Sequence, residues 1–339
     1  MRIVVDAMGS DNFPMPDVEG AVQAARLYPA DDIVLVGDQT RIQNELKKYD
    51  TQGLKIEIVH TTQNVTMEDH PGDVGRTKKD SSMLVGMNLV RDGKADAFVT
   101  AGNTGAALAI ATLHSLRRIP GVKRPALTSL VPTAGETVAL VDLGANTDCK
   151  ADWLVQFGIM ANVYAQRVME RHNPSVALLS NGEEESKGNA LVKEAGDLLR
   201  QTSLNFVGNV EPKDMMAGKI DVVVADGFVG NICIKSMEAV GSMLFRLLQE
   251  QVKRNPLAIL GALLMRPALR SIYHKADPFE IGGAPLLGVN GVVIIGHGRS
   301  NAKGIKNAIG QARKAVQGNL IAAIREGMTQ FVTETHEVE

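Results

Sequence analysis

The sequence predicts an α/β fold: a doubly wound, mostly parallel sheet with helices on both faces, which is an α/β/α sandwich. Three observations predict it. Short, continuous apolar runs recur along the 339 residues, as is typical of strands buried on both faces. Segments of helical periodicity lie between these runs, and such alternation favours parallel strands. Glycine-rich polar turns follow several of the runs.

Ten segments have the pattern of strands, and helical patterns separate them. The predicted strands are residues 2–6, 33–37, 54–60, 97–100, 127–131, 138–142, 176–180, 205–207, 222–225 and 292–295. The clearest helical patterns are residues 18–27, 105–116, 153–171 and 230–254. Internal repeats and low-complexity linkers are absent. We therefore expect a single domain, residues 1–339, with a helical hairpin protruding at about 240–276.

Composition excludes several classes of protein. Hydrophobic residues make up 45% of the chain and charged residues 22%, as in ordinary globular enzymes. A net charge of −2 and an aromatic content of 4% argue against nucleic-acid binding, which needs clustered cations and stacking platforms. Cys149 and Cys233 fit neither a metal spacing nor a disulfide scaffold, which favours a reducing cytoplasm. We expect no signal peptide, and no apolar run of the roughly 18 residues that a spanning helix needs.

Five predicted strands end in polar, glycine-rich turns. In open parallel sheets, ligands bind beyond the carboxyl ends of the strands, so these turns are the first candidates for a site. We expect them to assemble one polar cleft at one edge of the sheet, although each alone is also consistent with an ordinary turn. The turns are residues 6–11, 100–105, 142–146, 180–189 and 225–231.

Individual side chains in these turns have alternative interpretations. Asn103 and Thr104 either cap the following helix or donate to an anion. Lys187 follows three glutamates, so it is either part of a solvated charge run or a cation that neutralises an oxyanion or phosphate. Asn231 is either a helix cap or an amide donor to a carbonyl oxygen. His297 lies between two glycines and has no obvious packing role.

The stretch 282–309 joins a glycine-rich loop, an apolar strand, a polar turn and a helix start. This order directs free backbone N–H groups at an anion, so we expect a site for phosphate or another negatively charged oxygen. Residues 296–301 resemble a dinucleotide fingerprint, but Asn301 replaces its last glycine and no acidic residue follows about 20 positions on. We therefore expect no nicotinamide cofactor. Zinc, Walker and nucleophile-elbow motifs are also absent, so no metal is expected.

Six segments together resemble the bacterial phosphate acyltransferase family, in order and over nearly the whole chain. They are DAMGSD (6–11), VTAGNTGA (99–106), DLGANTDCK (142–150), NGEEESKGN (181–189), DGFVGN (226–231) and GGAPLLGVNGVVIIGHGRSNAK (282–303). The family usually has glycine where this chain has Ser10. The resemblance implies a fold akin to phosphotransacetylase and to isocitrate and isopropylmalate dehydrogenases, a homodimer and no cofactor.

The resemblance also implies a reaction, in which inorganic phosphate attacks the thioester of a long-chain acyl group on acyl carrier protein. The acyl phosphate formed would serve an early step of bacterial phospholipid synthesis. Lys187 and Asn231 would be the catalytic donors to the reacting centre. Substrate or phosphate binding would fall to Asp6, Gly9, Asp11, Asn103, Thr104, Asn146, His297, Gly298 and Ser300.

Two other functions stay open at this point. A nicotinamide- and metal-dependent dehydrogenase of related fold would need an acidic metal cluster and a complete cofactor loop. A fatty-acid-binding protein would explain an apolar pocket but not five polar strand ends.

Residues 251–276 predict a reversible contact with an anionic membrane surface. Pro256 and Pro267 should interrupt and restart the helix, leaving an apolar tip too short to span a bilayer. The expected membrane contacts are Leu257, Leu260, Leu263 and Leu264. Flanking cations would add attraction to an anionic leaflet; they are Lys253, Arg254, Arg266, Arg270 and Lys275. The protein would then be cytoplasmic and peripherally attached to the inner face of the cell membrane. The alternative is that the run packs into a dimer interface or the core.

Overall fold

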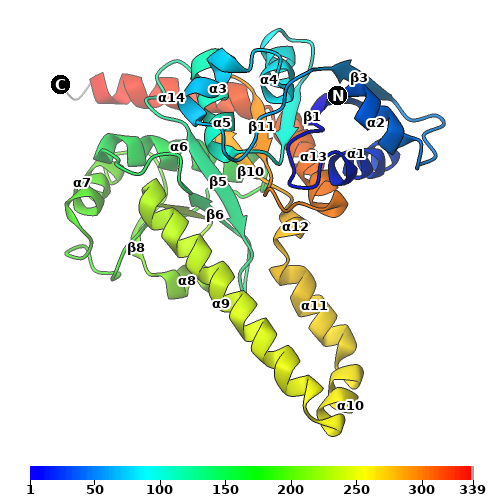
Figure 1. Ribbon diagram of the computed structural model, residues 1–339. Coiled ribbons are helices and arrows are strands. Elements are labelled where there is room, and N and C mark those ends of the chain that lie inside the picture. Colours follow the sequence, from blue (N-terminus) through cyan, green and yellow to red (C-terminus); the bar gives the residue numbers. More distant parts are fainter. Residues whose placement is uncertain (337–339) are drawn as a thin grey trace.

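The computed structural model describes residues 1–336, within which an eleven-stranded sheet crosses the molecule in the order β3-β2-β1-β4-β11-β10-β5-β6-β9-β7-β8 (Figure 1). The strands are β1 (Arg2–Asp6), β2 (Asp32–Gly37), β3 (Ile56–His60), β4 (Ala97–Thr100), β5 (Ala126–Val131), β6 (Val138–Val141), β7 (Val176–Leu179), β8 (Phe206–Val210), β9 (Val222–Val224), β10 (Ala284–Leu287) and β11 (Val292–Ile295).

Helices connect most of these strands, as the sequence predicts. They are α1 (Met15–Leu27), α2 (Gln39–Leu46), α3 (Pro71–Thr77), α4 (Ser82–Arg91), α5 (Thr104–Ala109) with the π-helical turn η1 (Ile110–His114), α6 (Ala151–Arg167), α7 (Ala190–Leu199), α8 (Pro212–Met216), α9 (Gly227–Lys253), α10 (Pro256–Leu264), α11 (Arg266–Ala276), α12 (Pro278–Ile281), α13 (Ala302–Gln317) and α14 (Leu320–His336).

The sheet consists of two parallel groups that run in opposite directions. Strands β3, β2, β1, β4 and β11 pair in parallel, and so do β6, β9, β7 and β8. Between the groups, β10 is antiparallel to both β11 and β5, and β5 is antiparallel to β6. Three reversals in succession leave β6 antiparallel to β11. The prediction of a mostly parallel sheet is confirmed, but β10 was expected to be a loop.

Alternate residues along the strands pack into clusters on opposite faces. In β1, Ile3 and Val5 join the cluster that holds α1, α13, α6 and α14 against one face, whereas Val4 joins the cluster under α4 and α5. In β6, Leu140 faces a third cluster with Met215 of α8. This alternation is what strands buried on both faces require. The predicted α/β/α sandwich is therefore confirmed.

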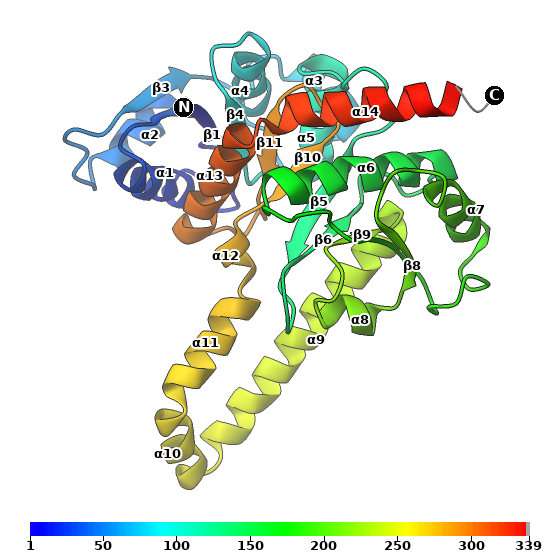
Figure 2. The same ribbon diagram turned by 180° about the vertical axis from the view of Figure 1, so that it is seen from behind.

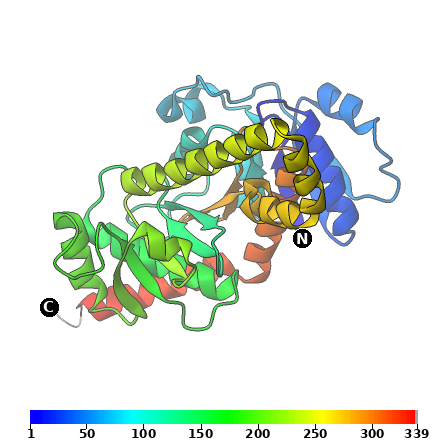
Figure 3. The same ribbon diagram turned by 90° about the horizontal axis from the view of Figure 1, so that it is seen from below.

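Helices α9, α10 and α11 form a hairpin that projects away from the sheet (Figures 1 and 2). Asn255 caps α10 by accepting a hydrogen bond from the N–H of Leu257 at 2.9 Å, and Pro256 occupies the first turn. Seen from below, the hairpin lies in front of the body, and α10 joins the far ends of α9 and α11 (Figure 3). Among the described residues, α9 is long and apolar enough to cross a membrane by length and composition. The expectation that no stretch meets this test is therefore wrong, although one such helix is weak evidence for a span.

Candidate functional site

The first group of candidate residues lies where β1, β4 and β11 end. The buried carboxylate of Asp6 accepts hydrogen bonds from Thr100 Oγ1 at 2.9 Å and from the N–H of Met8 at 3.1 Å. Burial raises the pKa of Asp6. Because both carboxylate oxygens are used inside the protein, Asp6 ties β1 to β4 and is poorly placed to touch an anion.

The loops after these three strands approach each other backbone to backbone. A Cβ atom at Gly9 would lie 2.9 Å from Thr100 Oγ1 and 3.0 Å from the N atom of Gly102. Asp11 donates its N–H to the carbonyl oxygen of Gly298 at 2.8 Å, and a Cβ atom at Gly298 would lie 2.5 Å from Asp11 Oδ1. A side chain at Gly9 would press on the backbone of the loop after β4, whereas one at Gly298 would displace the side chains of Asp11 and Met67. These two glycines therefore set the geometry of the first group.

Asn103 is a helix cap. Its Oδ1 accepts from the N–H of Ala106 at 3.0 Å, and its Nδ2 donates to the carbonyl oxygens of Thr66 and Met67 at 3.2 and 3.4 Å. The capping interpretation is the one that the geometry supports, since the side-chain amide is engaged within the protein. Thr104 lies next to it, exposed in the first turn of α5.

The loop after β11 presents groups that suit an anion. Ser300 is buried, and its Oγ has no hydrogen-bond partner in the described part of the chain. A buried hydroxyl left unpaired is costly, so a ligand or water at this position would stabilise it. The exposed imidazole of His297 accepts the N–H of Arg299 at Nδ1, at 3.2 Å. Asn301 caps α13 through the N–H of Gly304 at 3.0 Å.

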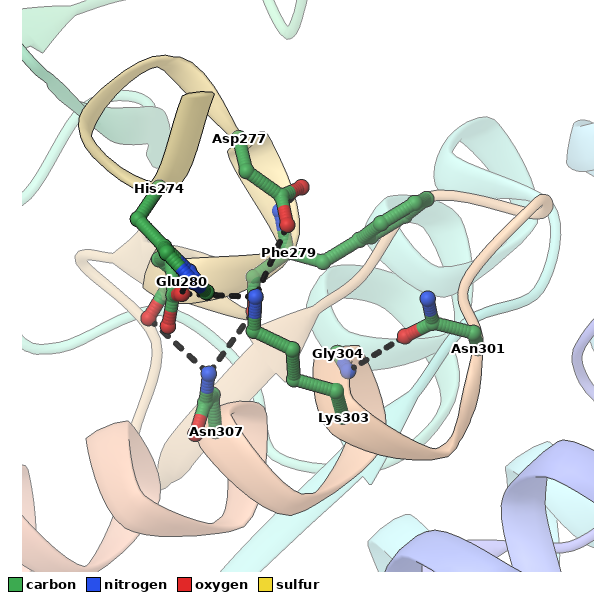
Figure 4. Close-up of polar contacts among 8 residues, drawn as sticks. All are labelled: His274, Asp277, Phe279, Glu280, Asn301, Lys303, Gly304 and Asn307. Carbon is green, nitrogen blue, oxygen red and sulfur yellow. Dashed lines mark hydrogen bonds and ion pairs between the residues drawn. The ribbon is translucent and has the colours of Figure 1, made fainter. Parts of the chain in front are cut away.

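A polar network fixes the start of α13 against α12 (Figure 4). Lys303 Nζ lies 2.8 Å from Asp277 Oδ2 and 2.6 Å from Glu280 Oε1. Asn307 Nδ2 donates to the carbonyl oxygens of Phe279 and Glu280 at 2.8 and 3.1 Å. Lys303 is thus committed to two carboxylates rather than to an anion. The network joins the foot of the hairpin to the loop that holds Ser300.

The second group of candidate residues lies where β6 and β9 end. The buried Asp142 carboxylate accepts from the N–H of Ala145 at 2.9 Å and from both the N–H and the Nδ2 of Asn146 at 2.8 Å. Burial raises the pKa of Asp142. Asn146 Nδ2 also donates to the carbonyl oxygen of Pro125 at 2.8 Å. Both amide hydrogens of Asn146 are therefore engaged, which leaves its side chain holding the turn together.

Asn231 does not cap α9, so that alternative is wrong. The cap is Asp226, whose Oδ1 accepts from the N–H groups of Phe228 and Val229 at 3.0 and 2.9 Å. Asn231 lies one turn further on, with its Nδ2 3.2 Å from where a Cβ atom at Gly144 would be. Its amide has no hydrogen-bond partner among the contacts of the described residues, so it remains an available donor.

The glutamates beside Lys187 are held by other groups. Glu183 pairs with Lys213 at 3.3 Å and Glu185 with Arg200 at 3.1 Å. The carbonyl oxygen of Glu184 accepts from the backbone N–H of Lys187 at 2.9 Å. Lys187 is exposed, and its ammonium forms no ion pair with the carboxylates that the structure describes. The three glutamates do form a charged, solvated run, but they leave the Lys187 ammonium available to a ligand.

The two groups do not meet at one edge of the sheet, contrary to expectation. Since β6, β7 and β9 run opposite to β1, β4 and β11, their carboxyl ends point to opposite edges. Leu143 and Ala145, in the turn after β6, pack against the hydrophobic cluster that also contains Ala107 and Ile110 of α5 and η1, so both groups border one cluster. No sequence pattern encodes the three antiparallel pairings that cause the reversal.

One cavity lies away from both groups. It has a volume of about 560 Å³ and is lined by residues that include Arg167, Arg313 and Lys314. The carboxyl ends of α6 and α13 lie at this cavity, and their cations balance the negative ends of the helix dipoles. None of the site residues predicted from the sequence lines it. This cavity therefore contributes nothing to the candidate site.

Sequence reasoning missed the buried pair Ser10 and Asp17. Ser10 was part of a quoted motif, but Asp17 lies within an ordinary helix start and gives no local signal. The roles of Thr100 and Asp226 were also missed, although each directly follows or ends a buried strand in a turn already singled out. Polar residues at such positions are candidates for locking a turn as well as for binding a ligand.

Comparisons with solved structures define the fold class. The chain resembles a phosphotransacetylase from Streptococcus pyogenes with a TM-score of 0.61 at 19% identity, covering 93% of this chain and 94% of that one. It also resembles a 4-hydroxythreonine-4-phosphate dehydrogenase from Klebsiella pneumoniae, with a TM-score of 0.51 at 13% identity and coverage of 94% and 99%. These likenesses confirm the predicted relation to phosphotransacetylase and to dehydrogenases of related fold.

Sequence comparison places the chain more narrowly. A family described as fatty acid synthesis protein matches residues 1–323, and the chain belongs to this family. A relative from Alkaliphilus oremlandii, named phosphate acyltransferase, is 47% identical over 337 residues, covering 99% of this chain and 100% of the relative. The resemblance to the bacterial phosphate acyltransferase family, which the six motifs indicate, is confirmed.

Proposed function

We infer that this chain is a phosphate acyltransferase, which transfers an acyl group to inorganic phosphate in lipid synthesis. The single observation that carries the inference is the 47% identity, over essentially both whole chains, to a protein of that name. Acyl carrier protein is the donor that this activity implies. The product is an acyl phosphate, and the carrier leaves with a free thiol.

In the proposed mechanism, a phosphate oxygen attacks the thioester carbonyl carbon, and the carbon–sulfur bond then breaks. The carrier sulfur leaves as a thiolate and takes up the proton that the attacking hydrogen phosphate releases. The first group holds phosphate: Ser300 offers an unpaired hydroxyl, and the N–H groups near Gly298 precede the start of α13. Lys187 and Asn231 stabilise the oxyanion that develops on the carbonyl oxygen. Holding both reactants in place supplies much of the rate, so no covalent intermediate is required.

Neither cysteine suits nucleophilic catalysis. Burial and the nearby charge of Asp142 raise the pKa of Cys149 to about 12, and burial raises the pKa of Cys233. At neutral pH both are thiols, whereas the attacking species would have to be a thiolate. The geometry therefore supports direct attack by phosphate over an acyl-cysteine intermediate.

The function is tested by incubating the purified protein with hexadecanoyl-acyl carrier protein and phosphate. Hydroxylamine then converts any acyl phosphate to a hydroxamate, which is quantified by mass spectrometry. Phosphate-dependent hydroxamate formation is expected. Reduction of a nicotinamide cofactor, or acyl binding without turnover, would favour the dehydrogenase or the fatty-acid-binding protein instead. The comparisons do not favour either alternative, since the relatives at full coverage are acyltransferases by name.

We also propose that the hairpin tip contacts an anionic membrane surface. Four leucines at the tip are strongly exposed: Leu257 at 78%, Leu260 at 55%, Leu263 at 61% and Leu264 at 77%. Arg266 and Arg270 stand beside them; the side chain of Lys275 lies outside the described part of the chain. Exposed leucines flanked by cations suit the headgroup boundary of a leaflet. The protein would be cytoplasmic and peripherally attached to the membrane.

A homodimer is proposed from the exposed apolar residues of α9. Met243, Leu244, Leu247 and Leu248 are each about half exposed, between 47% and 58%. Apolar patches of this kind on one helix mark an interface, and a second copy of the chain would present the same surface in an isologous contact. Sedimentation equilibrium tests this directly: a monomer at all concentrations would contradict the proposal.

A further inference from the structure

The loop that joins η1 to β5 carries a concentration of positive charge that the proposed chemistry does not use. Residues 115–125, SLRRIPGVKRP, contain four cations and no acid, in a chain whose net charge is −2. The cations are Arg117, Arg118, Lys123 and Arg124, and all four side chains are exposed. We call these residues the basic loop.

The backbone of the basic loop is held in place. Ile119 is fully packed at 1% exposure, and its N–H donates to the carbonyl oxygen of Gly288 at 3.0 Å. The buried side chain of Gln156 accepts the N–H of Lys123 at 2.8 Å and donates to the carbonyl oxygen of Gly121 at 3.0 Å. The loop is therefore a fixed scaffold for its cations rather than a flexible, solvated charge run.

Three of the four cations have no acidic partner among the described side chains. Lys123 pairs with Asp152. Arg117 and Arg118 donate to the carbonyl oxygens of Leu113 and Lys123, and neither forms an ion pair with any side chain that the structure describes. A partner bearing negative charge would meet three uncompensated guanidinium groups here.

Arg124 is stacked on an aromatic ring. Its guanidinium lies 4.8 Å from the ring centre of Trp153, the only tryptophan of the chain. Stacking restrains the guanidinium and leaves its N–H groups available to carboxylates. Arginine and tryptophan are also the residues most often found at the energetic centres of protein interfaces.

The basic loop borders the second group of candidate site residues. Pro125 ends the loop, and its carbonyl oxygen accepts from Asn146 Nδ2 at 2.8 Å. The carbonyl oxygen of Asn146 in turn accepts from the N–H of Gly227 at 2.7 Å, one turn before Asn231. A protein seated on the basic loop would thus lie at the rim of the region where an acyl thioester is proposed to react.

We propose that the basic loop docks an acidic face of the acyl carrier protein. This inference rests on the proposed function, in which the thioester arrives on a protein that must sit outside the site while its acyl group enters. Fixed cations at the rim raise the rate of encounter with an acidic partner and orient it. The membrane contact proposed for the hairpin involves different residues, at the far tip of α9 and α10.

The test compares variants that remove the charge with variants that keep it. Arg117→Asn suits the positive φ of 66° at that position, and it is combined with Arg118→Gln and Arg124→Gln. The matched variant carries Arg118→Lys and Arg124→Lys. Lys94→Gln is the control for losing an exposed cation elsewhere on the body. Thermal unfolding of each variant establishes that it is folded.

Binding is measured by fluorescence anisotropy of labelled acyl carrier protein at low and high salt, and turnover is measured with hexadecanoyl-acyl carrier protein. The triple variant should raise the Kd and the KM for the carrier by roughly tenfold at low salt, with kcat within about twofold of the wild type. High salt should shrink the difference, because it screens charge. Lys94→Gln should bind as the wild type does, and the lysine variant should lose less affinity than the triple variant, because it keeps the charge but not the stacked guanidinium.

Unchanged Kd and KM in a folded triple variant would overturn the docking proposal, even if the wild type makes acyl phosphate. Carrier binding that depends on the three arginines without any turnover would instead leave docking in place and overturn the proposed function. Loss of binding to anionic vesicles with unchanged carrier affinity would assign the basic loop to a membrane and would also overturn the proposal.

Discussion

Ser10 donates its hydroxyl hydrogen to a carboxylate oxygen of Asp17 at 2.5 Å, and both side chains are buried. The other oxygen of Asp17 has no hydrogen-bond partner among the described residues. Burial, assisted by the charge of Asp6, raises the pKa of Asp17 to about 8. The carboxyl is therefore neutral at pH 7, directly beneath the loop of the first group.

Asp17 makes the stability of the protein depend on pH. Its pKa is raised in the folded state from an ordinary value of 3.8 to about 8, so the folded chain keeps a proton that the unfolded chain releases. The stability that the Asp17 proton contributes is complete below the unfolded pKa of 3.8. It falls as pH rises from there to about 8, and above that pH the free energy of unfolding no longer changes through Asp17. Asp17→Asn should flatten this decline by up to about 1.4 kcal/mol per pH unit. Urea unfolding at several pH values measures how the free energy of unfolding changes with pH in the wild type and in Asp17→Asn. Parallel curves for the two proteins would contradict a raised pKa for Asp17.

Lys187→Ala should lower kcat by about a hundredfold, the usual loss for one electrostatic donor to a transition state. Thermal stability should change little, because the side chain is exposed and unpaired within the described residues. Lys193→Ala, another exposed lysine six residues on, is the matched control. A steady-state assay with acyl carrier thioester measures kcat for both variants. A near-normal kcat for Lys187→Ala would show that Lys187 is part of a solvated charge run and not a catalytic donor.

Asn231→Ala and Asp226→Ala should separate catalysis from capping. Asn231→Ala should reduce kcat with little loss of stability, since the cap of α9 is elsewhere. Asp226→Ala should cost about 1 kcal/mol of stability, because it removes the acceptor for two N–H groups. Calorimetry and turnover are measured on both. If Asn231→Ala unfolded earlier and kept its kcat, its role would be structural.

Leu260→Glu and Leu263→Glu should abolish sedimentation with anionic vesicles, because burying a charge in the headgroup boundary is unfavourable. Leu27→Glu alters a similarly exposed leucine on the body, 57% exposed, and should sediment as the wild type does. Sedimentation equilibrium runs in parallel. Tip variants that bind vesicles normally, or that lose dimerisation instead, would assign the tip to a protein interface.

Turnover should not depend on a metal or a nicotinamide. Among the side chains that the structure describes, no three His, Cys, Asp or Glu residues are grouped as metal ligands, and the loop at 296–301 lacks the last glycine of a dinucleotide fingerprint. Exhaustive chelation followed by dialysis should leave kcat unchanged. A loss that added metal restores would show that the prediction is wrong.

The sequence predicts the fold better than the assembly of the site. Continuous apolar runs identify most strands, because burial on both faces demands them. The strand at Ala284–Leu287 was missed because four residues between glycines resemble a loop. Its antiparallel pairings reverse one half of the sheet, and they depend on contacts between distant segments. The extent of the domain, residues 1–339, stays a prediction, and residues 337–339 lie outside the described residues.

Some of the site residues could be predicted from the sequence, and others could not. Gly9 and Gly298 could be singled out from sequence, because a turn after a buried strand tolerates few side chains. Asn103 and Asn146 have the residue type of ligand donors, but their amides serve the protein's own backbone. The sequence does not distinguish an asparagine that binds a ligand from one that binds the protein's own backbone, since both uses need the same hydrogen-bonding groups. Lys187 can be distinguished from an ordinary solvated charge run only in the structure, where Glu183 and Glu185 pair with Lys213 and Arg200.

The central claim is that phosphate itself takes the acyl group from the carrier, and product analysis with oxygen-18-labelled phosphate tests it most directly. The protein is incubated with hexadecanoyl-acyl carrier protein and fully labelled phosphate, and the products are analysed by mass spectrometry. Direct attack predicts acyl phosphate that retains all of the phosphate oxygens with their label, together with free carrier, and no release of carrier when phosphate is left out. Release of fatty acid or an acyl-enzyme adduct without labelled acyl phosphate would contradict the account.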